Sequence, residues 1–278
     1  MKIYIIGSTG FFGNSFVKFF QKKNWEILTE RTNILDLSAI QNFLQKNSPD
    51  VVLNCAGKTG TPNVDWCESN KAETTAVNIC GATNLAIACA QKNIFFAHVG
   101  SGCIFAGDNN GKGFTEEDEP NFGGSFYSRT KAISEKILSE FDALQFRVRI
   151  PICAHSHPKN VINKLLKYEK VASIENSFTI VEDFLPAAYD LIKNKTKGIF
   201  NMTNEGSMDH KFLMENYKKI VDPSKNFSYI EEQDLQKIVI APRSNCVLNT
   251  DKQKKFNIHM PNIKERIPEI LTSYKNNL

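Results

Sequence analysis

The chain opens with MKIYIIGSTGFFG (residues 1–13), in which a short apolar run leads directly into a glycine-rich turn. The run Lys2–Ile6 is rich in isoleucine and predicts a buried strand, and the periodic segment Phe11–Lys22 predicts a helix. Glycines between a strand and a helix let the backbone approach a phosphate, toward which the helix N-terminus then points. The G-x-x-G-x-x-G spacing therefore predicts a dinucleotide-binding turn, with an ordinary glycine-rich turn as the alternative. Its candidate cofactor contacts are Gly7, Thr9, Gly10, Phe11, Phe12 and Gly13.

Beyond this turn, short apolar runs alternate with helix-length segments. The expected strands are Trp25–Thr29, Val51–Asn54, Ile94–Val99 and Leu144–Arg149, and the expected helices are Ser38–Gln45, Glu73–Gln91 and Tyr127–Phe141. Strands separated by helices imply right-handed βαβ units and a parallel sheet. We therefore expect an α/β fold, a Rossmann-type doubly wound parallel sheet whose ligand crevice lies at the carboxyl ends of the strands.

The pattern loosens after Pro151. The second half is expected to hold helices at Asn160–Glu169, Val181–Lys193, Lys211–Ile220 and Asn262–Tyr274, and a strand at Gly198–Met202. We predict that residues 1–150 form the dinucleotide-binding domain and that residues 181–203 return to it. Residues 151–180 and 204–278 then form a smaller C-terminal substrate lobe over the crevice.

Composition narrows the class of protein. No apolar run approaches the roughly 20 residues that span a bilayer, and the N-terminus is typical of a first strand rather than a signal peptide, so we expect a cytoplasmic protein without a membrane partner. A net charge of +4 makes no case for nucleic acid. The seven cysteines form no C-x-x-C pair, and His155 and His157 lack a third ligand nearby, so no metal site is expected. The oligomeric state stays open, a homodimer being one alternative.

The segment after the second predicted strand bears on which dinucleotide binds. A carboxylate at this strand end favours NAD, whereas an arginine favours the additional phosphate of NADP. Arg31 is the candidate for that phosphate, although Glu30 precedes it and a solvated surface arginine is the alternative. Asp36 is a further candidate cofactor contact.

Tyr127 and Lys131 are four residues apart and therefore lie on one face of a predicted helix. Reduction of a ketone needs a hydride on carbon and a proton on oxygen. A tyrosine with its usual pKa near ~10 gives up its proton reluctantly, and a nearby ammonium assists by stabilising the phenolate. Ser101, just past a predicted strand end, can polarise the same carbonyl. The alternative for the pair is a surface helix turn.

With these motifs in this order, the chain resembles the extended short-chain dehydrogenase/reductase family. The segment Asn54-Cys55-Ala56-Gly57 is similar to that family's N-A-A-G segment, and Asn78 resembles the asparagine that supports its active-site lysine. The resemblance implies catalytic roles for Ser101, Tyr127 and Lys131, and cofactor contacts at Asn54, Ala56, Gly57, Asn78, Tyr127 and Lys131.

A narrower resemblance spans nearly the whole chain. The segments Pro62–Ser69, Ser101–Phe105, Gly124–Ser128 and Ala241–Asn245 are similar to the nucleotide-rhamnose synthase/epimerase-reductase family, which includes the C-terminal part of plant rhamnose synthases. That resemblance implies conversion of UDP-4-keto-6-deoxy-glucose to UDP-L-rhamnose. The implied reactions are epimerisation at C3 and C5, followed by reduction at C4 with NADPH.

Epimerisation next to a ketone requires one group to remove a proton and another to return one on the opposite face. Cys103 lies two residues past Ser101, and a thiol near cations can titrate near neutral pH. The resemblance implies that Lys164 is its partner. The alternatives are a packing cysteine and a solvated lysine.

Candidate substrate contacts are Val64, Asp65, Ser101, Cys103, Asn163, Arg243 and Asn245, among which Arg243 suits a bidentate grip on diphosphate. The chain departs from the rhamnose enzymes at Ser8, at Thr61 and along Ala154–Lys159, which leaves the base and the sugar configuration open. Two other functions also stay open: a 4-ketoreductase without epimerase activity, and a non-catalytic NADP-binding sensor.

Overall fold

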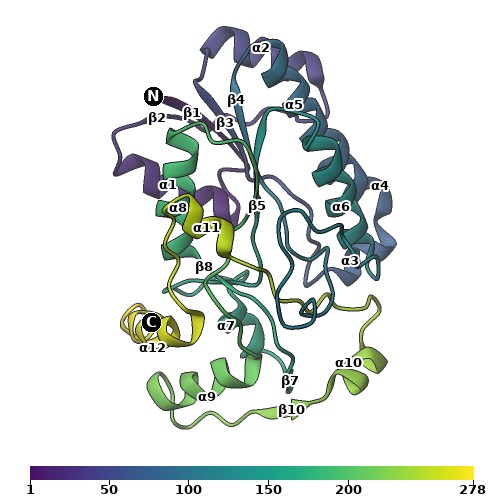
Figure 1. The fold of residues 1–278 in the computed structure, drawn as a ribbon, viewed down its shortest axis with the longest axis vertical. Helices are drawn as coiled ribbons and strands as arrows, with labels where there is room; N and C mark the ends of the chain where they lie inside the picture. The colour runs from purple at the N-terminus through teal and green to yellow at the C-terminus, as the bar shows by residue number, and fades with distance from the viewer.

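The computed structural model describes residues 1–278, apart from the side chains of Glu232, Gln236 and Ile238. A six-stranded parallel sheet, with strand order β2-β1-β3-β4-β5-β9, forms its centre (Figure 1). The strands are β1 Lys2–Ile6, β2 Glu26–Leu28, β3 Val51–Asn54, β4 Phe95–Val99, β5 Ala143–Arg147 and β9 Gly198–Asn201. The predicted Rossmann-type doubly wound sheet is confirmed.

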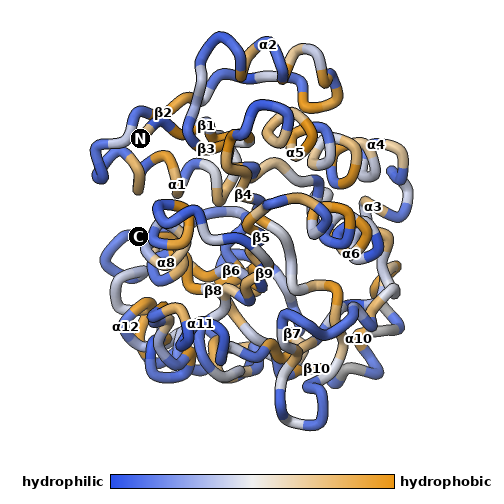
Figure 2. The backbone as a smooth tube through the Cα atoms, turned by 45° about the horizontal axis from the view of Figure 1, so that its top comes forward, coloured by the Kyte–Doolittle hydropathy of each residue, from blue (hydrophilic) through white to orange (hydrophobic). Residues whose placement is uncertain are grey.

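Helices cover both faces of this sheet. On one face lie α1 (Phe11–Gln21) and α8 (Val181–Lys193), and on the other lie α2 (Leu37–Asn47), α5 (Ala82–Gln91) and α6 (Phe126–Leu138) (Figure 1). Strands sandwiched in this way are buried on both faces, which is why they read as continuous apolar runs. Figure 2 shows the same distribution, with apolar stretches along the central strands and hydrophilic loops around them.

The helix predicted at Glu73–Gln91 is one continuous helical run that includes a π-helical segment. It consists of α4 (Lys71–Thr75), the segment η1 (Ala76–Gly81) and α5. The predicted long helix is therefore confirmed, and its π-helical segment is a feature that the sequence did not predict. A π turn inserts one residue into the helix and changes the direction of its side chains, and such turns occur often at functional sites. Asn78, a candidate site residue, lies within it.

The second half builds a smaller group of elements below the sheet in Figure 1. Its short strands pair as β6 with β8 and as β7 with β10. Its elements are β6 Pro151–Ile152, α7 Val161–Leu165, β7 Lys170–Ala172, β8 Thr179–Ile180, α9 His210–Ile220, β10 Ser228–Ile230, α10 Glu232–Ile238 and α12 Ile263–Asn276. A separate apolar core joins α7, α9 and α12. The division of the chain into a dinucleotide domain and a substrate lobe stays a prediction.

Two departures mark this half. The helix predicted over Asn160–Glu169 ends at Leu165. The amides of Lys167 and Tyr168 bond to carbonyls three residues earlier instead of four, and β7 then begins at Lys170. The segment α11 (Asp251–Lys255) packs against β9, where Gln253 Nε2 donates to the Asn201 carbonyl at 2.6 Å. Among the described helices, none combines the length and the apolar character needed to cross a membrane.

Candidate active site

The glycine turn lies where the sheet order reverses, between β1 and β3. Gly7 has a φ of +72°, and a Cβ on it would lie 2.8 Å from the amide nitrogen of Ala56. A Cβ on Gly13 would lie 2.1 Å from the Gly7 carbonyl oxygen. Both positions therefore require glycine, because the backbone segments approach too closely for a Cβ atom.

Replacing Gly13 with alanine should distort this turn. Because the new methyl group meets a backbone carbonyl that cannot move alone, we expect a loss of about 1–3 kcal/mol in the free energy of unfolding, together with weaker dinucleotide binding. Urea unfolding measures the first effect and fluorescence titration with NADPH the second. Gly123→Ala is the matched control, since its nearest neighbour would be Arg129 Cγ at 3.9 Å. Equal stability and affinity in the two variants would contradict the argument.

The start of α1 fits an anionic ligand. Its N-cap is Gly10, which has no side-chain capping bond, so the first backbone N–H groups of the helix point outward uncapped. Thr9 precedes this cap, and the rings of Phe11 and Phe12 pack against His157 and Phe184 at centroid distances of 4.6 and 5.6 Å.

The two candidates after β2 differ in their surroundings. Arg31 is exposed, and its guanidinium makes no hydrogen bond or ion pair with the other described residues, so it is available to an additional phosphate. Asp36 instead caps α2, accepting a hydrogen bond from the Ala39 amide at 2.9 Å. A contact between Asp36 and the cofactor stays a prediction, because capping α2 already explains the position of this carboxylate.

A hydrogen-bonded chain connects β3 to Lys131, the candidate catalytic lysine. The side-chain oxygen of Asn54 accepts from the Ala56 N–H at 2.9 Å, which fixes the orientation of the amide. The side-chain nitrogen of Asn54 therefore faces His98 Nδ1 at 3.1 Å. A neutral imidazole that accepts at Nδ1 carries its proton on Nε2. That atom lies 3.3 Å from Lys131 Nζ, which also donates to the Val99 carbonyl. A donor that faces Lys131 Nζ disfavours the ammonium form without removing it at neutral pH.

Burial acts in the same sense on both groups. Desolvation lowers the pKa of Lys131 to about 8, and desolvation followed by the charge of Lys131 holds the pKa of His98 well below its usual value. His98 was not a candidate from the sequence. Its signal was a polar residue within an otherwise apolar strand run, two residues before the glycine that precedes Ser101.

Asn78 ties the segment after β3 to α6. Its side-chain oxygen accepts from the Lys58 amide at 2.7 Å, and its nitrogen donates to the Lys58 carbonyl and to Thr130 Oγ1. Thr130 precedes Lys131, and Gly57 lies directly before Lys58. Asn78 is thus linked to Lys131 only through Thr130 and α6, and its support of the lysine stays a prediction.

Ser101, Tyr127 and Lys131 are all buried around the carboxyl end of β4. Ser125 starts α6 as its N-cap, accepting from the Ser128 amide at 3.1 Å, which sets the phase of the helix and points Tyr127 toward β4. Burial, and then the charge of Cys103, raises the pKa of Tyr127, while a hydrogen bond with Ser101 lowers it. At neutral pH the phenol therefore keeps its proton and can donate it.

Cys103 faces the same group of side chains. Cys103 lies near enough to Tyr127, Lys131 and Lys164 for charge on its sulfur to act on all three. Lys164, on α7, is half-buried, and desolvation, followed by the charge of Lys159, lowers its pKa. Two groups able to exchange protons thus lie near one another, one in the segment after β4 and the other on α7. Cys103 Sγ also accepts from Arg149 Nη1 at 3.0 Å, a contact that was not foreseen from the sequence.

Two of the candidate substrate residues bind each other. Asp65, the first residue of α3 (Asp65–Ser69), accepts from Arg243 in a bidentate pair, with Nη1 to Oδ1 at 2.6 Å and Nη2 to Oδ2 at 2.9 Å. The pair joins segments 178 residues apart, and Asp65 also accepts from the Ala241 amide. Val64 is the N-cap of α3. The bidentate geometry expected of Arg243 is thus directed at a carboxylate of the protein.

The two candidate asparagines are also engaged. Asn163, on α7, accepts from the His157 amide at 3.0 Å and donates to Ser156 Oγ at 2.8 Å, which anchors the loop that precedes α7. Asn245 accepts from the Asn176 side chain at 3.2 Å. Contacts of either residue with a substrate stay predictions.

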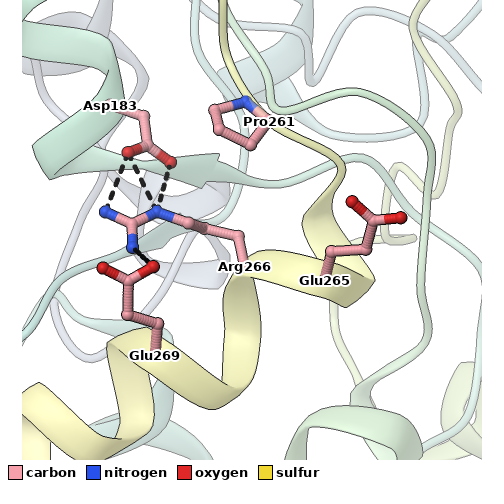
Figure 3. Close-up of a pocket in the computed structure, with 5 residues that line it drawn as sticks. All are labelled: Asp183, Pro261, Glu265, Arg266 and Glu269. Carbon is pink, nitrogen blue, oxygen red and sulfur yellow. Dashed lines mark hydrogen bonds and ion pairs between the residues drawn. The ribbon is translucent and has the colours of Figure 1, made fainter.

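A pocket close to the C-terminal helix holds none of these residues. Figure 3 shows it lined by Asp183, Pro261, Glu265, Arg266 and Glu269, with the Arg266 guanidinium held between the carboxylates of Asp183 and Glu269. It is a surface ion-pair cluster between α8 and α12. Among the described residues, no group of three or more His, Cys, Asp or Glu side chains is placed to hold a metal ion.

The parallel sheet, the glycine turn at its switch point and the buried Ser101, Tyr127 and Lys131 define a reductase of the extended short-chain dehydrogenase/reductase class. Within that class, the model of the RmlD substrate binding domain matches residues 1–276. The chain belongs to this family.

Relatives of the chain agree with this assignment. The bifunctional dTDP-4-dehydrorhamnose 3,5-epimerase/dTDP-4-dehydrorhamnose reductase of Arabidopsis thaliana is 39% identical over 273 residues, covering 95% of this chain and 90% of that protein. A trifunctional plant protein with UDP-glucose 4,6-dehydratase, 3,5-epimerase and UDP-4-keto-L-rhamnose-reductase in its name is 38% identical, and the chain spans 41% of its length. The solved UDP-rhamnose synthase of Acanthamoeba polyphaga mimivirus superposes with a TM-score of 0.95, at 33% identity, over 98% of this chain and 99% of that one.

Proposed function

We propose that this chain is a bifunctional 3,5-epimerase/4-reductase that uses NADPH to convert UDP-4-keto-6-deoxy-glucose to UDP-L-rhamnose. The observation that supports the proposal is that Ser101, Tyr127 and Lys131 are buried together, with Cys103 and Lys164 near enough for their charges to interact. A 4-keto group serves both reactions, since it accepts the hydride and also acidifies the hydrogens at C3 and C5.

NADPH fits the residues around the glycine turn. A Cβ would fill the cradle at Gly7 and Gly13, the start of α1 is uncapped, and Arg31 is exposed without a partner among the described side chains. When bound, NADPH supplies the hydride. Tyr127 then gives its proton to the sugar O4, Ser101 polarises the carbonyl, and Lys131 holds the ribose and stabilises the phenolate.

The epimerase half is supported by the second pair. A thiolate at Cys103 can take a proton from the carbon next to the ketone, and the electron pair of the broken C–H bond moves to O4 as an enolate. A group on the other face, Lys164, returns a proton to that carbon. The bifunctional Arabidopsis relative carries both activities in its name, and the chain aligns with 90% of its length.

The protonation state of Lys131 predicts how reduction depends on pH. Its pKa is lowered to about 8, so the ammonium form prevails below pH 8 and the neutral amine above it. Because the ammonium is the form that stabilises the phenolate, we expect kcat/KM for NADPH to be level up to about pH 7.5 and then to fall, by about tenfold per pH unit at the limit. A pH profile that stays level to pH 10 would contradict this role.

One experiment tests the proposed function directly. The protein is incubated with NADPH and UDP-4-keto-6-deoxy-glucose in D2O, and the products are read by NMR. Deuterium at both C3 and C5 of an L-rhamnose product supports the proposal. Reduction without deuterium at either carbon identifies a simple 4-ketoreductase, and no NADPH oxidation with UDP-, dTDP- or GDP-linked substrates identifies a non-catalytic binding protein.

A further inference from the structure

Arg149 is a buried cation beside Cys103. It follows β5 by two residues, and only 2% of its surface is exposed. Its guanidinium donates to three neighbours, the Asn176 side-chain oxygen, the Ser244 carbonyl and Cys103 Sγ, the last at 3.0 Å. Its Nε is buried without a partner. The first two acceptors are neutral, so they satisfy hydrogen bonds but no charge.

Other arginines of this chain are paired differently. Arg147 meets Glu135 at 2.8 Å, Arg243 meets Asp65, and Arg266 meets Asp183. For Arg149, no carboxylate among the described side chains lies within 4.0 Å of its nitrogens. A buried charge without a counter-ion is strongly destabilising. Of the ionisable neighbours whose charge acts on Arg149, the phenol of Tyr127 keeps its proton at neutral pH, which leaves two thiols.

Two thiols lie close enough to act on this guanidinium, and their hydrogen bonds tell them apart. Negative charge on either Cys246 or Cys103 raises the pKa of Arg149. Cys246 Sγ donates to the Gly102 carbonyl at 3.3 Å, so it keeps its proton, and burial raises its pKa. Cys103 Sγ accepts from Arg149 and donates to no described acceptor. Cys103 is therefore the side chain whose ionisation would compensate Arg149.

We propose that Arg149 is a positioning residue that holds Cys103 as a thiolate in the resting protein. This inference rests on the proposed function, in which the pairing prepares Cys103 as the base. The thiolate takes a proton from the carbon beside the ketone and forms an S–H bond, while the electron pair of the broken C–H bond gives the enolate with its charge on O4. Titratable and charged groups that face Cys103 from the surrounding elements are Arg149, Lys164, Tyr127, Lys131 and Cys246. Only Arg149 among them donates a described hydrogen bond to the sulfur.

The test is the pH dependence of alkylation at Cys103. The protein is treated with iodoacetamide between pH 6 and pH 9, and the modified Cys103 peptide is quantified by mass spectrometry, with the exposed Cys80 of the same chain as the reference for reagent activity. With a thiolate already formed, the rate at Cys103 is expected to be nearly level. In Arg149→Met the rate should rise by about two orders of magnitude across this range, as for a thiol with a pKa near 8.5.

Two further variants keep the outcome decisive. Arg149→Lys retains the positive charge without the planar guanidinium, and its profile should lie between those of the wild type and Arg149→Met. Lys164→Met should leave the level profile in place. A wild-type profile as steep as that of a free thiol would overturn the inference, even if Arg149→Met does not fold. So would a level profile in folded Arg149→Met.

The outcomes also separate this inference from the proposed function. A level alkylation profile without solvent deuterium in the sugar would retain the Arg149–Cys103 pair and remove the epimerase activity. Solvent deuterium at C3 and C5 together with a steep profile would retain the epimerase activity and remove the role of Arg149.

Discussion

Tyr127→Phe should abolish ketone reduction while isotope exchange at C3 or C5 remains detectable. The substitution removes one oxygen atom from a buried side chain whose phenol keeps its proton at neutral pH, because burial raises its pKa. Without that proton donor the alkoxide formed by hydride transfer has only Ser101 to stabilise it. Loss of a general acid costs about 10²–10⁴-fold in rate, so we expect NADPH oxidation to fall by at least that lower figure.

The measurement is NADPH oxidation by absorbance, with deuterium incorporation from D2O followed in the same samples. Tyr189→Phe is the matched control, because Tyr189 packs against Phe19, Phe20 and Trp25 on the far side of α1 and α8. Both proteins should bind NADPH with similar affinity. Turnover by Tyr127→Phe at the rate of the Tyr189→Phe control would remove Tyr127 from its role.

The parts of this site that the sequence predicts well are those encoded by local patterns. The turn from Gly7 to Gly13 is a strand, a set of glycine positions and a helix within a few residues, and its conformational needs follow from the absence of Cβ atoms. Tyr127 and Lys131 are related by the helical repeat alone. Predicting these required no knowledge of which strands become neighbours.

The parts that the sequence does not predict depend on contacts between distant segments. His98 matters because β4 pairs with β3 in a register that sets Asn54 beside it, and Arg149 because residues 46 and 95 positions away supply its acceptors. Arg243 is bound to Asp65 across 178 residues. The π turn at Asn78 likewise reflects tertiary demands, since no propensity in Ala76–Gly81 requires it.

The pairing of Asp65 with Arg243 changes how substrate binding should be pictured. A bidentate pair that is half-buried already satisfies the guanidinium, so a diphosphate could bind Arg243 only by sharing or displacing the carboxylate. The pKa of Asp65 is lowered chiefly by its hydrogen bond with Arg243, so the pair persists throughout the neutral range. An equally consistent role is to hold the segment around Ala241 against α3 at the edge of the crevice.

Cys103→Ala should have the opposite effect to Tyr127→Phe. Deuterium incorporation at C3 and C5 is expected to fall by at least about 10²-fold, since the base is removed, whereas NADPH binding should be unchanged because the glycine turn and Lys131 are intact. Conversion of UDP-4-keto-6-deoxy-glucose to UDP-L-rhamnose should stop with it. The already epimerised ketone, UDP-4-keto-L-rhamnose, bypasses the missing step, and the variant should reduce it at close to the wild-type rate.

Supplying both ketones to the same variant therefore distinguishes lost chemistry from lost folding. A protein that has merely unfolded reduces neither, while one that lacks only the base reduces the epimerised sugar alone. Cys80→Ala is the control, because Cys80 is exposed and the reactions proposed here do not use it. Wild-type exchange in Cys103→Ala would transfer the base to another residue. The substitution also removes the sulfur that accepts from the buried Arg149 cation, so it should lower the free energy of unfolding whatever its effect on exchange.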